Sequence, residues 1–218
     1  AMGAGRLARG LSSSRWVQRQ RSDVFVQRAK NEGYRSRAAF KLLELDASHR
    51  LLFPGAAVVD LGAAAGGWTQ VAVSKVATKR KTPGTVVAVD LRPMDPVAGA
   101  TFIQGDVTTD ECLETVRSLL PAARCDLLLS DMAPSATGVR HADQARSLEL
   151  NHVAFEFATQ LLRPGGSFVC KFWTGSDIKE FHEYLKPFFT QVRRVKPKAC
   201  RSESKEMYFV AKSFKPPG

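Results

Sequence analysis

Short apolar runs alternate along the chain with longer stretches in which apolar residues recur at helical spacing. The short runs are rich in β-branched residues and predict seven strands, at 57–61, 85–91, 101–104, 126–130, 167–172, 191–195 and 207–211. The longer stretches predict helices at 23–30, at 36–45 with Ser36 as its cap, and at 68–76, 109–120, 142–162 and 177–186. The runs Val58-Val59 and Leu127-Leu128-Leu129 have no polar alternation, which is typical of central parallel strands buried on both faces.

This alternation of strands and helices predicts an α/β fold. We expect one Rossmann-like domain over 23–218, with a mostly parallel seven-stranded sheet, helices on both faces and ligands at the carboxyl ends of the strands. Only 11 residues separate the last two predicted strands, too few for a crossover helix, so these strands should form an antiparallel hairpin. An antiparallel last strand begins where its parallel neighbours end. Residues just before Met207 should therefore lie beside the ligand site.

Charge is distributed unevenly along the 218 residues, whose formal net charge is +11. Residues 1–50 carry a net +7 and residues 179–218 a net +6, whereas residues 51–178 carry a net −2. A near-neutral body with two basic ends favours a catalytic core whose ends bind a polyanion, although basic ends can also serve solubility alone. The segment 1–22 is rich in arginine and lacks acids, which is typical both of an RNA-binding arm and of a mitochondrial transit segment. Residues 1–3 resemble the remnant of a tag.

The same composition argues against several other classes of protein. No apolar run approaches the roughly 18 residues that a membrane span requires, so we expect no membrane association. The four cysteines form no CxxC pair and the four histidines do not cluster with them, so we expect no zinc site and a reducing compartment. Cys125 and Cys170 lie in or beside apolar runs and are interpreted as small core residues.

A glycine-rich turn, Gly62 to Trp68, follows the first predicted strand and opens a helix. Such a turn lets a ligand approach the backbone closely and offers the amide groups of a helix N-terminus. Asp90, at the end of the second strand, is placed to accept from ribose hydroxyls, and Asp106, after the third, from an adenine amino group. Each acid has the alternative role of a helix N-cap. Taken together they indicate an adenosine site, and the absence of a GxGxxG turn favours S-adenosylmethionine over NAD.

Two charged residues stand at the ends of later strands where apolar residues are expected. Asp131 ends the fourth strand, and Lys171 is flanked by Val169, Cys170, Phe172 and Trp173. A lysine in apolar surroundings is costly unless it is paired. The pair is interpreted as part of a catalytic site, with a structural salt bridge or a solvated strand end as the alternative.

Five segments together resemble a known family. They are RSRAAFKL with Lys41, the DLGAAAGGW turn, SDMAP at Ser130–Pro134, GGSFVCK at Gly165–Lys171 and SKEMYFVA at Ser204–Ala211. In this order, from Ser13 to Lys212, they resemble the FtsJ/RrmJ-type ribosomal RNA ribose 2′-O-methyltransferases. One departure is Ala65, where the family has proline. Alanine does not pre-set the backbone angle, so we expect somewhat weaker cofactor binding.

The resemblance implies S-adenosylmethionine as the cofactor and assigns site residues. The implied catalytic residues are Lys41, Asp131, Lys171 and Glu206, with Glu203 as a nearby alternative for the last. The implied cofactor-binding residues are Gly66, Gly67, Trp68, Asp90, Asp106 and Asp131. Lys171 would withdraw the proton of a ribose 2′-hydroxyl. The charge of Lys41 favours a neutral Lys171 and the two acids oppose it, so the direction of the net effect stays open.

The substrate is expected to contact the basic ends. The candidate residues of the N-terminal side are Arg15, Trp16, Arg19, Arg21, Arg28, Arg35 and Arg37. Those of the C-terminal side are Arg193, Arg194, Lys196, Lys198 and Arg201. Trp16 has packing on the domain as its alternative role.

The implied function is methyl transfer to a uridine ribose in large-subunit ribosomal RNA, by a monomer that acts on the RNA or on the large subunit. Transfer RNA and mRNA caps are alternative substrates. The chain resembles mitochondrial members, which implies the mitochondrial matrix, with the bacterial or eukaryotic cytoplasm as the alternative. Two rival functions are a non-catalytic RNA-binding assembly factor on the same fold and a nucleotide-dependent dehydrogenase.

Overall fold

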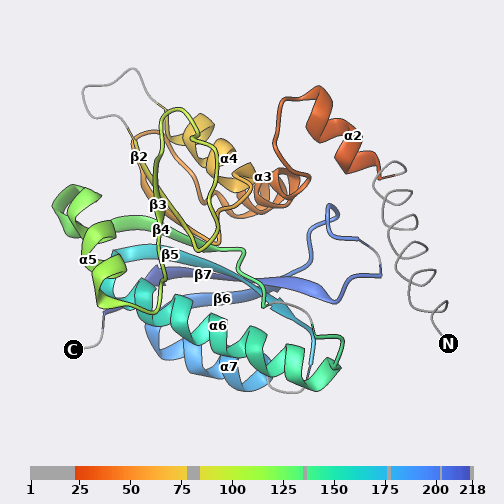
Figure 1. The fold of residues 1–218 in the computed structure, drawn as a ribbon. Coiled ribbons are helices and arrows are strands. Elements are labelled where there is room, and N and C mark those ends of the chain that lie inside the picture. The colour runs from red at the N-terminus through yellow and green to blue at the C-terminus, as the bar shows by residue number, and fades with distance from the viewer. Residues whose placement is uncertain (1–22, 78–83, 135–136, 176–177, 202, 217–218) are drawn as a thin grey trace, which may run out of the picture.

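One seven-stranded sheet runs through the molecule and separates two layers of helices (Figure 1). The computed structural model describes residues 23–77, 84–134, 137–175, 178–201 and 203–216. The strands are β1 (Ala57–Leu61), β2 (Thr85–Asp90), β3 (Thr101–Gln104), β4 (Cys125–Ser130), β5 (Leu162–Trp173), β6 (Phe189–Val195) and β7 (Glu206–Phe214). The helices are α2 (Val24–Asn31), α3 (Ala38–His49), α4 (Gly67–Val76), α5 (Asp110–Leu119), α6 (Arg140–Leu161) and α7 (Ile178–Leu185), with short 3-10 turns at Pro121–Ala123 and Lys186–Phe188.

The strand order is β3-β2-β1-β4-β5-β7-β6, and β7 alone runs against the other strands. The predicted α/β fold is therefore confirmed, as is the antiparallel pairing of the last two strands. In the register of β5 and β7, Lys171 lies opposite Tyr208 and Trp173 lies opposite Glu206. The first residue of β7 thus lies at the carboxyl edge of the parallel strands.

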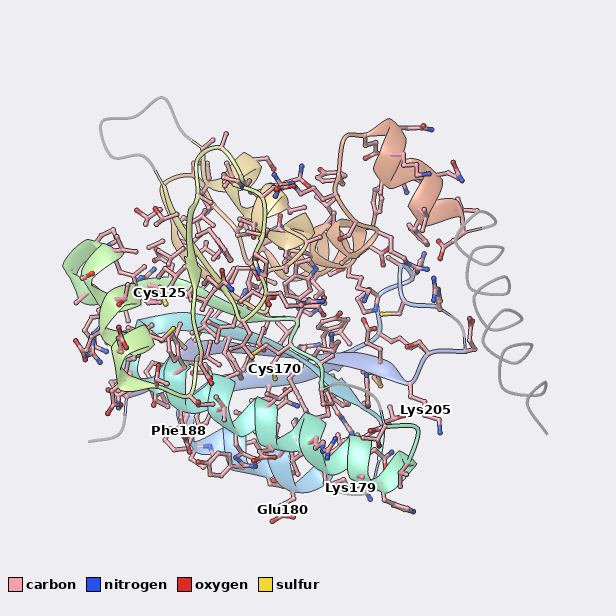
Figure 2. All side chains as sticks on the ribbon, viewed as in Figure 1. Cys125, Cys170, Lys179, Glu180, Phe188 and Lys205 are labelled. Carbon is pink, nitrogen blue, oxygen red and sulfur yellow. The ribbon has the colours of Figure 1, made fainter. Side chains whose placement is uncertain are left out.

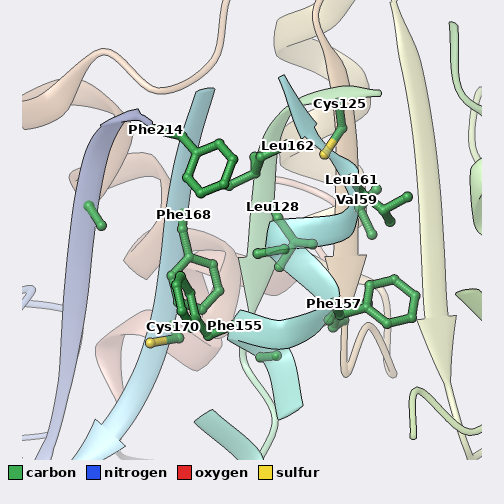
Figure 3. Close-up of a cluster of buried hydrophobic side chains, with 14 of the residues drawn as sticks. Val59, Cys125, Leu128, Phe155, Phe157, Leu161, Leu162, Phe168, Cys170 and Phe214 are labelled. Atoms are coloured by element: carbon green, nitrogen blue, oxygen red, sulfur yellow. The ribbon is translucent and has the colours of Figure 1, made fainter. Parts of the chain in front are cut away.

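Consecutive residues of the central strands pack into two different cores. Val58, Leu127 and Leu129 contact apolar residues of α3 and α4 on one face. Val59 and Leu128 belong to a second core with residues of α5, α6 and α7 on the other face, and Figure 3 shows the part of it that includes Phe155, Phe157 and Leu161 of α6. Side chains alternate between the faces of a strand, so an uninterrupted apolar run serves both cores at once.

Buried cysteines and exposed charges follow the expected distribution. All four cysteines are buried free thiols, and the expectation for Cys125 and Cys170 as core residues is confirmed. Figure 2 shows these two thiols among the strands, whereas Lys179, Glu180 and Lys205 point outward at the periphery. No helix in the described parts of the chain is long and apolar enough to span a bilayer.

The boundaries of several elements differ from those predicted. Strand β5 begins at Leu162 rather than at residue 167, because Leu162 pairs with Cys125 before a register shift brings Ser167 opposite Leu127. The prediction of Ser36 as a helix cap is wrong, since α3 starts at Ala38 with no side-chain cap. The Ser36 hydroxyl instead packs against the start of α4.

Candidate active site

The turn after β1 folds back onto the end of β2. The amide of Ala63 donates to the carbonyl of Val89 at 3.1 Å, and the amide of Ala64 donates to Asp90 Oδ2 at 2.9 Å. The buried Asp90 carboxylate also accepts from the amide of Arg92 at 2.8 Å. No helix begins at Asp90, so its alternative role as an N-cap is wrong. A carboxylate has about four acceptor positions, so Asp90 can hold the turn and still accept from a ligand hydroxyl.

Three glycines allow this turn to lie close to its neighbours. Gly62 and Gly66 have positive φ angles of +75° and +101°, which L side chains rarely adopt. A Cβ on Gly62 would lie 2.8 Å from Met132 Cγ, and one on Gly67 would lie 2.3 Å from Ser36 Oγ. The turn is thus packed between the residues that follow β4 and the residues that precede α3.

Asp106 lies in the loop after β3 and is exposed. Its Oδ1 accepts from the amide and the hydroxyl of Thr108, at 2.9 and 2.8 Å, and these hydrogen bonds lower the pKa of Asp106. The N-cap of α5 is Thr109, so the alternative role of Asp106 as the cap is wrong. Within the described residues Oδ2 of Asp106 has no hydrogen-bond partner and is free to accept from a ligand.

Trp68 contributes differently from the predicted cofactor contact. Its side chain is 3% exposed, its indole N–H donates to the carbonyl of Ala38 at 2.8 Å, and its ring centroid lies 5.5 Å from that of Tyr208. The ring is part of the core between α3, α4 and β7. Only the backbone of Trp68 is therefore available to a ligand at the turn.

Asp60, in the middle of β1, is a site residue that the sequence reasoning missed. It is fully buried, its Oδ2 accepts from Thr69 Oγ1 at 2.7 Å, and its Oδ1 has no partner among the described residues. Burial is the main cause that raises the pKa of Asp60 to about 7, and the nearby charges of Asp131 and Asp90 add to it. An acid inside an apolar strand was the available signal. The charges of Asp90 and Asp131 place negative potential beside the turn, which fits a cationic ligand such as a sulfonium.

Four charged side chains from four elements meet at the carboxyl edge of the sheet. Lys171, on β5, is 9% exposed, and its Nζ lies 3.1 Å from Asp131 Oδ1 and 2.5 Å from the Asp131 carbonyl oxygen. Lys41, on α3, forms an ion pair with Glu206 at the start of β7. The structure therefore brings together the four residues that the resemblance implied. Glu203, the alternative to Glu206, is exposed.

Tyr208 joins the two ion pairs, and the sequence reasoning did not single it out. Its hydroxyl lies 2.8 Å from Asp131 Oδ1 and 2.6 Å from Glu206 Oε1. Burial, with the charges of both acids, raises the pKa of this phenol well above its usual value, so Tyr208 is neutral. The available signal was its position two residues after Glu206, which places both side chains on one face of β7.

Glu206 is ionised within this cluster. Burial acts to raise its pKa, but the charge of Lys41 and the hydrogen bonds from Lys41 and Tyr208 outweigh burial, and the pKa of Glu206 is lowered. Cys200 Sγ lies 3.6 Å from Glu206 Oε1, and burial raises the pKa of that thiol to about 12. Cys200 is therefore a neutral neighbour of the cluster.

Several arginines that were predicted to contact phosphate are bound by other groups of the protein. Arg37 pairs with Asp23 and donates to the carbonyl of Ala199, and Arg201 Nε lies 3.3 Å from the same Asp23 carboxylate. The exposed Arg35 donates to backbone carbonyls of the loop before β3. Arg37 and Arg201 connect α2, the start of α3 and the segment before β7. Arg15, Trp16, Arg19 and Arg21 lie outside the described residues.

Arg193 and Arg194 are exposed neighbours on the edge strand β6 and point to opposite faces. Val192 packs with the core on the α6 and α7 side, and Val195 packs with the core on the α3 and α4 side. By alternation, Arg193 shares the face of Lys41, and Arg194 does not. The contacts of these arginines with RNA stay a prediction, and a single RNA segment on one face of β6 could reach only one of the two.

Parallel strands that end at a glycine-rich turn and acidic residues, beside paired lysines and acids, define the class of Rossmann-like methyltransferases. The sequence profile of FtsJ-like methyltransferases matches residues 34–214, and the chain belongs to that family. The chain is 46% identical to the ribosomal RNA large subunit methyltransferase E of Marinobacter nauticus over 96% of this chain and 99% of that protein. It is 47% identical to the protein of the same name from Granulibacter bethesdensis over 96% of this chain and 88% of that protein.

A solved structure agrees with these relatives. The crystal structure of a ribosomal RNA methyltransferase from Plasmodium falciparum superposes with a TM-score of 0.75 at 30% identity, over 84% of this chain and all of that one. The two relatives named above are bacterial, so they give no support to the expected mitochondrial location.

Proposed function

We propose that this protein transfers a methyl group from S-adenosylmethionine to a ribose 2′-hydroxyl in large-subunit ribosomal RNA, at a uridine. The observation that carries the proposal is the pair of lysine–acid contacts, Lys171 with Asp131 and Lys41 with Glu206, beside the glycine-rich turn. The names of the relatives support ribosomal RNA of the large subunit as the substrate. The uridine and the 2′-oxygen follow from the family resemblance in the sequence.

The cofactor would be held at the carboxyl ends of β1, β2, β3 and β4. Asp90 is placed to accept from ribose hydroxyls, Asp106 Oδ2 from an amino group, and the amides at the start of α4 to contact the remainder. When bound, S-adenosylmethionine supplies a methyl group on a positively charged sulfur. Asp90 and Asp131, whose charges act on the buried Asp60, supply negative potential at this edge that favours such a cation.

The lysine–acid cluster would prepare the hydroxyl for attack. A 2′-hydroxyl is a weak nucleophile until a base takes its proton, and Lys171 Nζ is the basic group that β5 places at this edge. Asp131 orients Lys171 through its side chain and its carbonyl oxygen. Glu206 orients Lys41, whose ammonium can bind a phosphate or ribose oxygen of the RNA.

The test uses the purified protein, methyl-labelled S-adenosylmethionine and large-subunit ribosomal RNA, supplied as free RNA and as large subunits. A 2′-O-methyl group blocks alkaline cleavage at its own linkage, so the labelled site appears as one alkali-resistant position. We expect one such position, at a uridine, with the wild type and with Lys179→Ala, and none with Lys171→Ala. Label on a base, or no transfer in either form of the substrate, would contradict the proposal.

Calorimetry with S-adenosylmethionine separates the proposal from its non-catalytic rival. An enzyme must bind the cofactor, whereas an RNA-binding assembly factor on the same fold need not. We expect binding that survives in Lys171→Ala. Absence of binding at millimolar cofactor would favour the assembly factor.

A further inference from the structure

Arg35 reaches from the loop before α3 to the loop after β2. Its Nη1 donates to the carbonyl of Asp95 at 2.5 Å and its Nη2 donates to the carbonyl of Pro96 at 2.6 Å, so one guanidinium binds two consecutive carbonyl groups. A guanidinium suits such a pair, because its N–H groups are held in one plane in a fixed fork. Arg35 therefore connects two segments that are 60 positions apart in the chain.

The backbone of Arg35 is held by the helix that opens at the glycine-rich turn. Gln70, on α4, accepts from the Arg35 amide through its Oε1 at 2.8 Å, and its Nε2 donates to the carbonyl of Gly33 at 3.0 Å. One side-chain amide thus binds the chain on both sides of residue 34. The Arg35 side chain therefore starts from a fixed point beside the turn.

The Arg35 side chain passes directly over the turn. A Cβ on Gly66 would lie 2.9 Å from Arg35 Nη1, 3.1 Å from Arg35 Cδ and 3.2 Å from Met94 Sδ. Gly66 is buried, although the arginine beside it is exposed. Arg35 and the loop after β2 are therefore packed on the backbone of the turn, which only a glycine at this position allows.

The loop at 91–97 has little else to hold it. It forms no helix or strand, and its two prolines cannot donate backbone hydrogen bonds. At its start the amide of Arg92 donates to Asp90 at 2.8 Å, and Nη2 of Arg92 lies 3.3 Å from the carbonyl of Ala64. Arg35 binds the other half of the loop. A segment with few hydrogen bonds of its own opens easily, so the contacts of Arg35 determine how firmly this loop lies on the turn.

We propose that Arg35 is a positioning residue of the cofactor site, which holds the 91–97 loop against the glycine-rich turn before S-adenosylmethionine binds. The inference rests on the proposed function, since the turn and Asp90 are the groups that would hold that cofactor. A ligand that meets an ordered loop does not have to supply the free energy of ordering it, so its affinity is higher. Arg35 thus acts on cofactor affinity rather than through the phosphate contact expected from the sequence.

A lysine at this position separates the two roles. A phosphate contact requires a positive charge within reach, and lysine keeps that charge. The contact with two carbonyl groups requires N–H groups fixed in one plane, which an ammonium on a flexible chain lacks. Arg35→Lys should therefore behave as the wild type toward RNA and as Arg35→Ala toward the cofactor.

The first test is calorimetry with S-adenosylmethionine on the wild type, Arg35→Ala, Arg35→Lys and Arg124→Ala. Arg124 is a matched control, because it is also exposed and its Nη1 donates to a backbone carbonyl, that of Gln160, at 2.9 Å. It directly precedes β4 and so lies at the opposite edge of the sheet. We expect both Arg35 variants to bind about tenfold more weakly and Arg124→Ala to bind as the wild type does. Unchanged affinity in the Arg35 variants would overturn the inference.

Titration of ribosomal RNA at several salt concentrations, without cofactor, tests the phosphate contact. Loss of one such contact would reduce the slope of log affinity against log salt by about 1. We expect the same slope for the wild type and both Arg35 variants. A reduced slope in Arg35→Ala alone, with cofactor affinity retained, would assign Arg35 to the RNA and overturn the inference.

Steady-state kinetics separate a positioning role from a general loss of folded protein. We expect the KM for S-adenosylmethionine to rise about tenfold in both Arg35 variants, with kcat within about twofold of the wild type, because the lysine–acid cluster is unaltered. A lower kcat with an unchanged KM would indicate a smaller fraction of folded enzyme and would contradict the inference.

Hydrogen exchange of the cofactor-free protein tests the loop itself. In the segment 91–100 the amides of Arg92 and Ala100 donate hydrogen bonds, and these amides exchange when the loop opens. We expect faster exchange there in both Arg35 variants and no change in Arg124→Ala. Equal exchange in the wild type and the Arg35 variants contradicts this inference alone, whereas a wild type that binds no S-adenosylmethionine contradicts the proposed function.

Discussion

The turn after β1 and the cluster around Lys171 lie at the same edge of one sheet but are built in different ways. The turn is formed by one continuous stretch, Gly62 to Trp68, whose amides bind Val89 and Asp90 on the adjacent strand. The cluster takes its members from α3, β5, β7 and the residue that follows β4, and Lys41 and Glu206 are 165 positions apart. The turn therefore depends on residue types within a short segment, whereas the cluster depends on the order and direction of the strands.

The two regions also differ in how their charges are compensated. Near the turn, Asp60 has no cationic partner among the described residues, and burial raises its pKa to about 7. In the cluster Glu206 is also largely enclosed but is paired with Lys41, and its pKa is lowered. The unpaired buried acid therefore keeps its proton up to about neutral pH, whereas the paired acid is ionised.

Substitution of Lys171 should have the largest effect on the rate of methyl transfer. It should change the cluster and leave the glycine-rich turn as it is. We expect Lys171→Ala to lower the rate of methyl transfer by about a thousandfold, because a positioned acid–base group contributes roughly 10²–10⁴. Cofactor affinity, measured by calorimetry, should change by no more than a few-fold, since the turn is unaltered. Lys179→Ala, an exposed lysine on α7, is the control and should retain full activity. Wild-type turnover in Lys171→Ala would refute the assignment.

The buried Asp60 beside the turn should make the free energy of unfolding depend on pH between 4 and 7. The ordinary pKa of an aspartate is 3.8 and that of Asp60 in the fold is about 7, so between these pH values the folded protein holds a proton that the unfolded chain has lost. The free energy of unfolding should therefore fall as pH rises from 4 to 7 and level off above 7. The upper limit of this loss is about 4 kcal/mol.

Asp60→Asn should remove this dependence. The amide stays neutral, so the variant should be more stable than the wild type at pH 7.5 and gain little at pH 4. Urea denaturation at both pH values measures the difference. Equal pH dependence in the two proteins would show that Asp60 is ionised in the fold.

A substitution at Gly62 should break the turn. Gly62 and Gly33 both have a φ of +75°, but a Cβ on Gly62 would clash with Met132, whereas one on Gly33 meets no atom within 4 Å. Both alanine variants should lose about 1–3 kcal/mol from backbone strain. Gly62→Ala should lose more, and it alone should weaken cofactor binding, by about tenfold. Thermal denaturation and calorimetry compare the two, and equal cofactor affinity would contradict a cofactor site at this turn.

The smallest expected effect concerns the edge strand β6. Arg193 lies on the face of Lys41 and Arg194 on the opposite face. Loss of one phosphate contact should reduce the slope of log affinity against log salt by about 1. We expect this for Arg193→Ala and an unchanged slope for Arg194→Ala, measured by titration of ribosomal RNA at several salt concentrations. The reverse result would place the RNA on the α6 and α7 side.

Local chemistry made part of the site predictable from sequence. Lys171 was noticeable because an ammonium among Val169, Cys170 and Phe172 is costly, and the structure pairs it with Asp131 as that cost requires. Asp60 had the same signal and was missed because it lay within a motif already explained by its glycines. The signal for Tyr208 was only its position two residues after Glu206, since a tyrosine among Met207, Phe209 and Val210 otherwise resembles a core residue.

Partners distant in the chain changed the roles of other residues. Trp68 was predicted at the cofactor, and that contact stays a prediction for its backbone alone, because its ring fills the space between α3 and β7. Arg37 was predicted to contact phosphate, but Asp23 and Ala199 engage it. In both cases the residue type was compatible with either role, and the neighbour that decided between them comes from another element.

The amino-acid sequence by itself determined the alternation of strands and helices, the glycine turn and the antiparallel last strand, because propensity, turn chemistry and connection length act over short distances. The tertiary structure alone decided that the Tyr208 hydroxyl lies between two acids and that Arg193, rather than Arg194, shares the face of Lys41. These relations depend on the order of the strands and the register between β5 and β7, which are set by packing across the whole sheet.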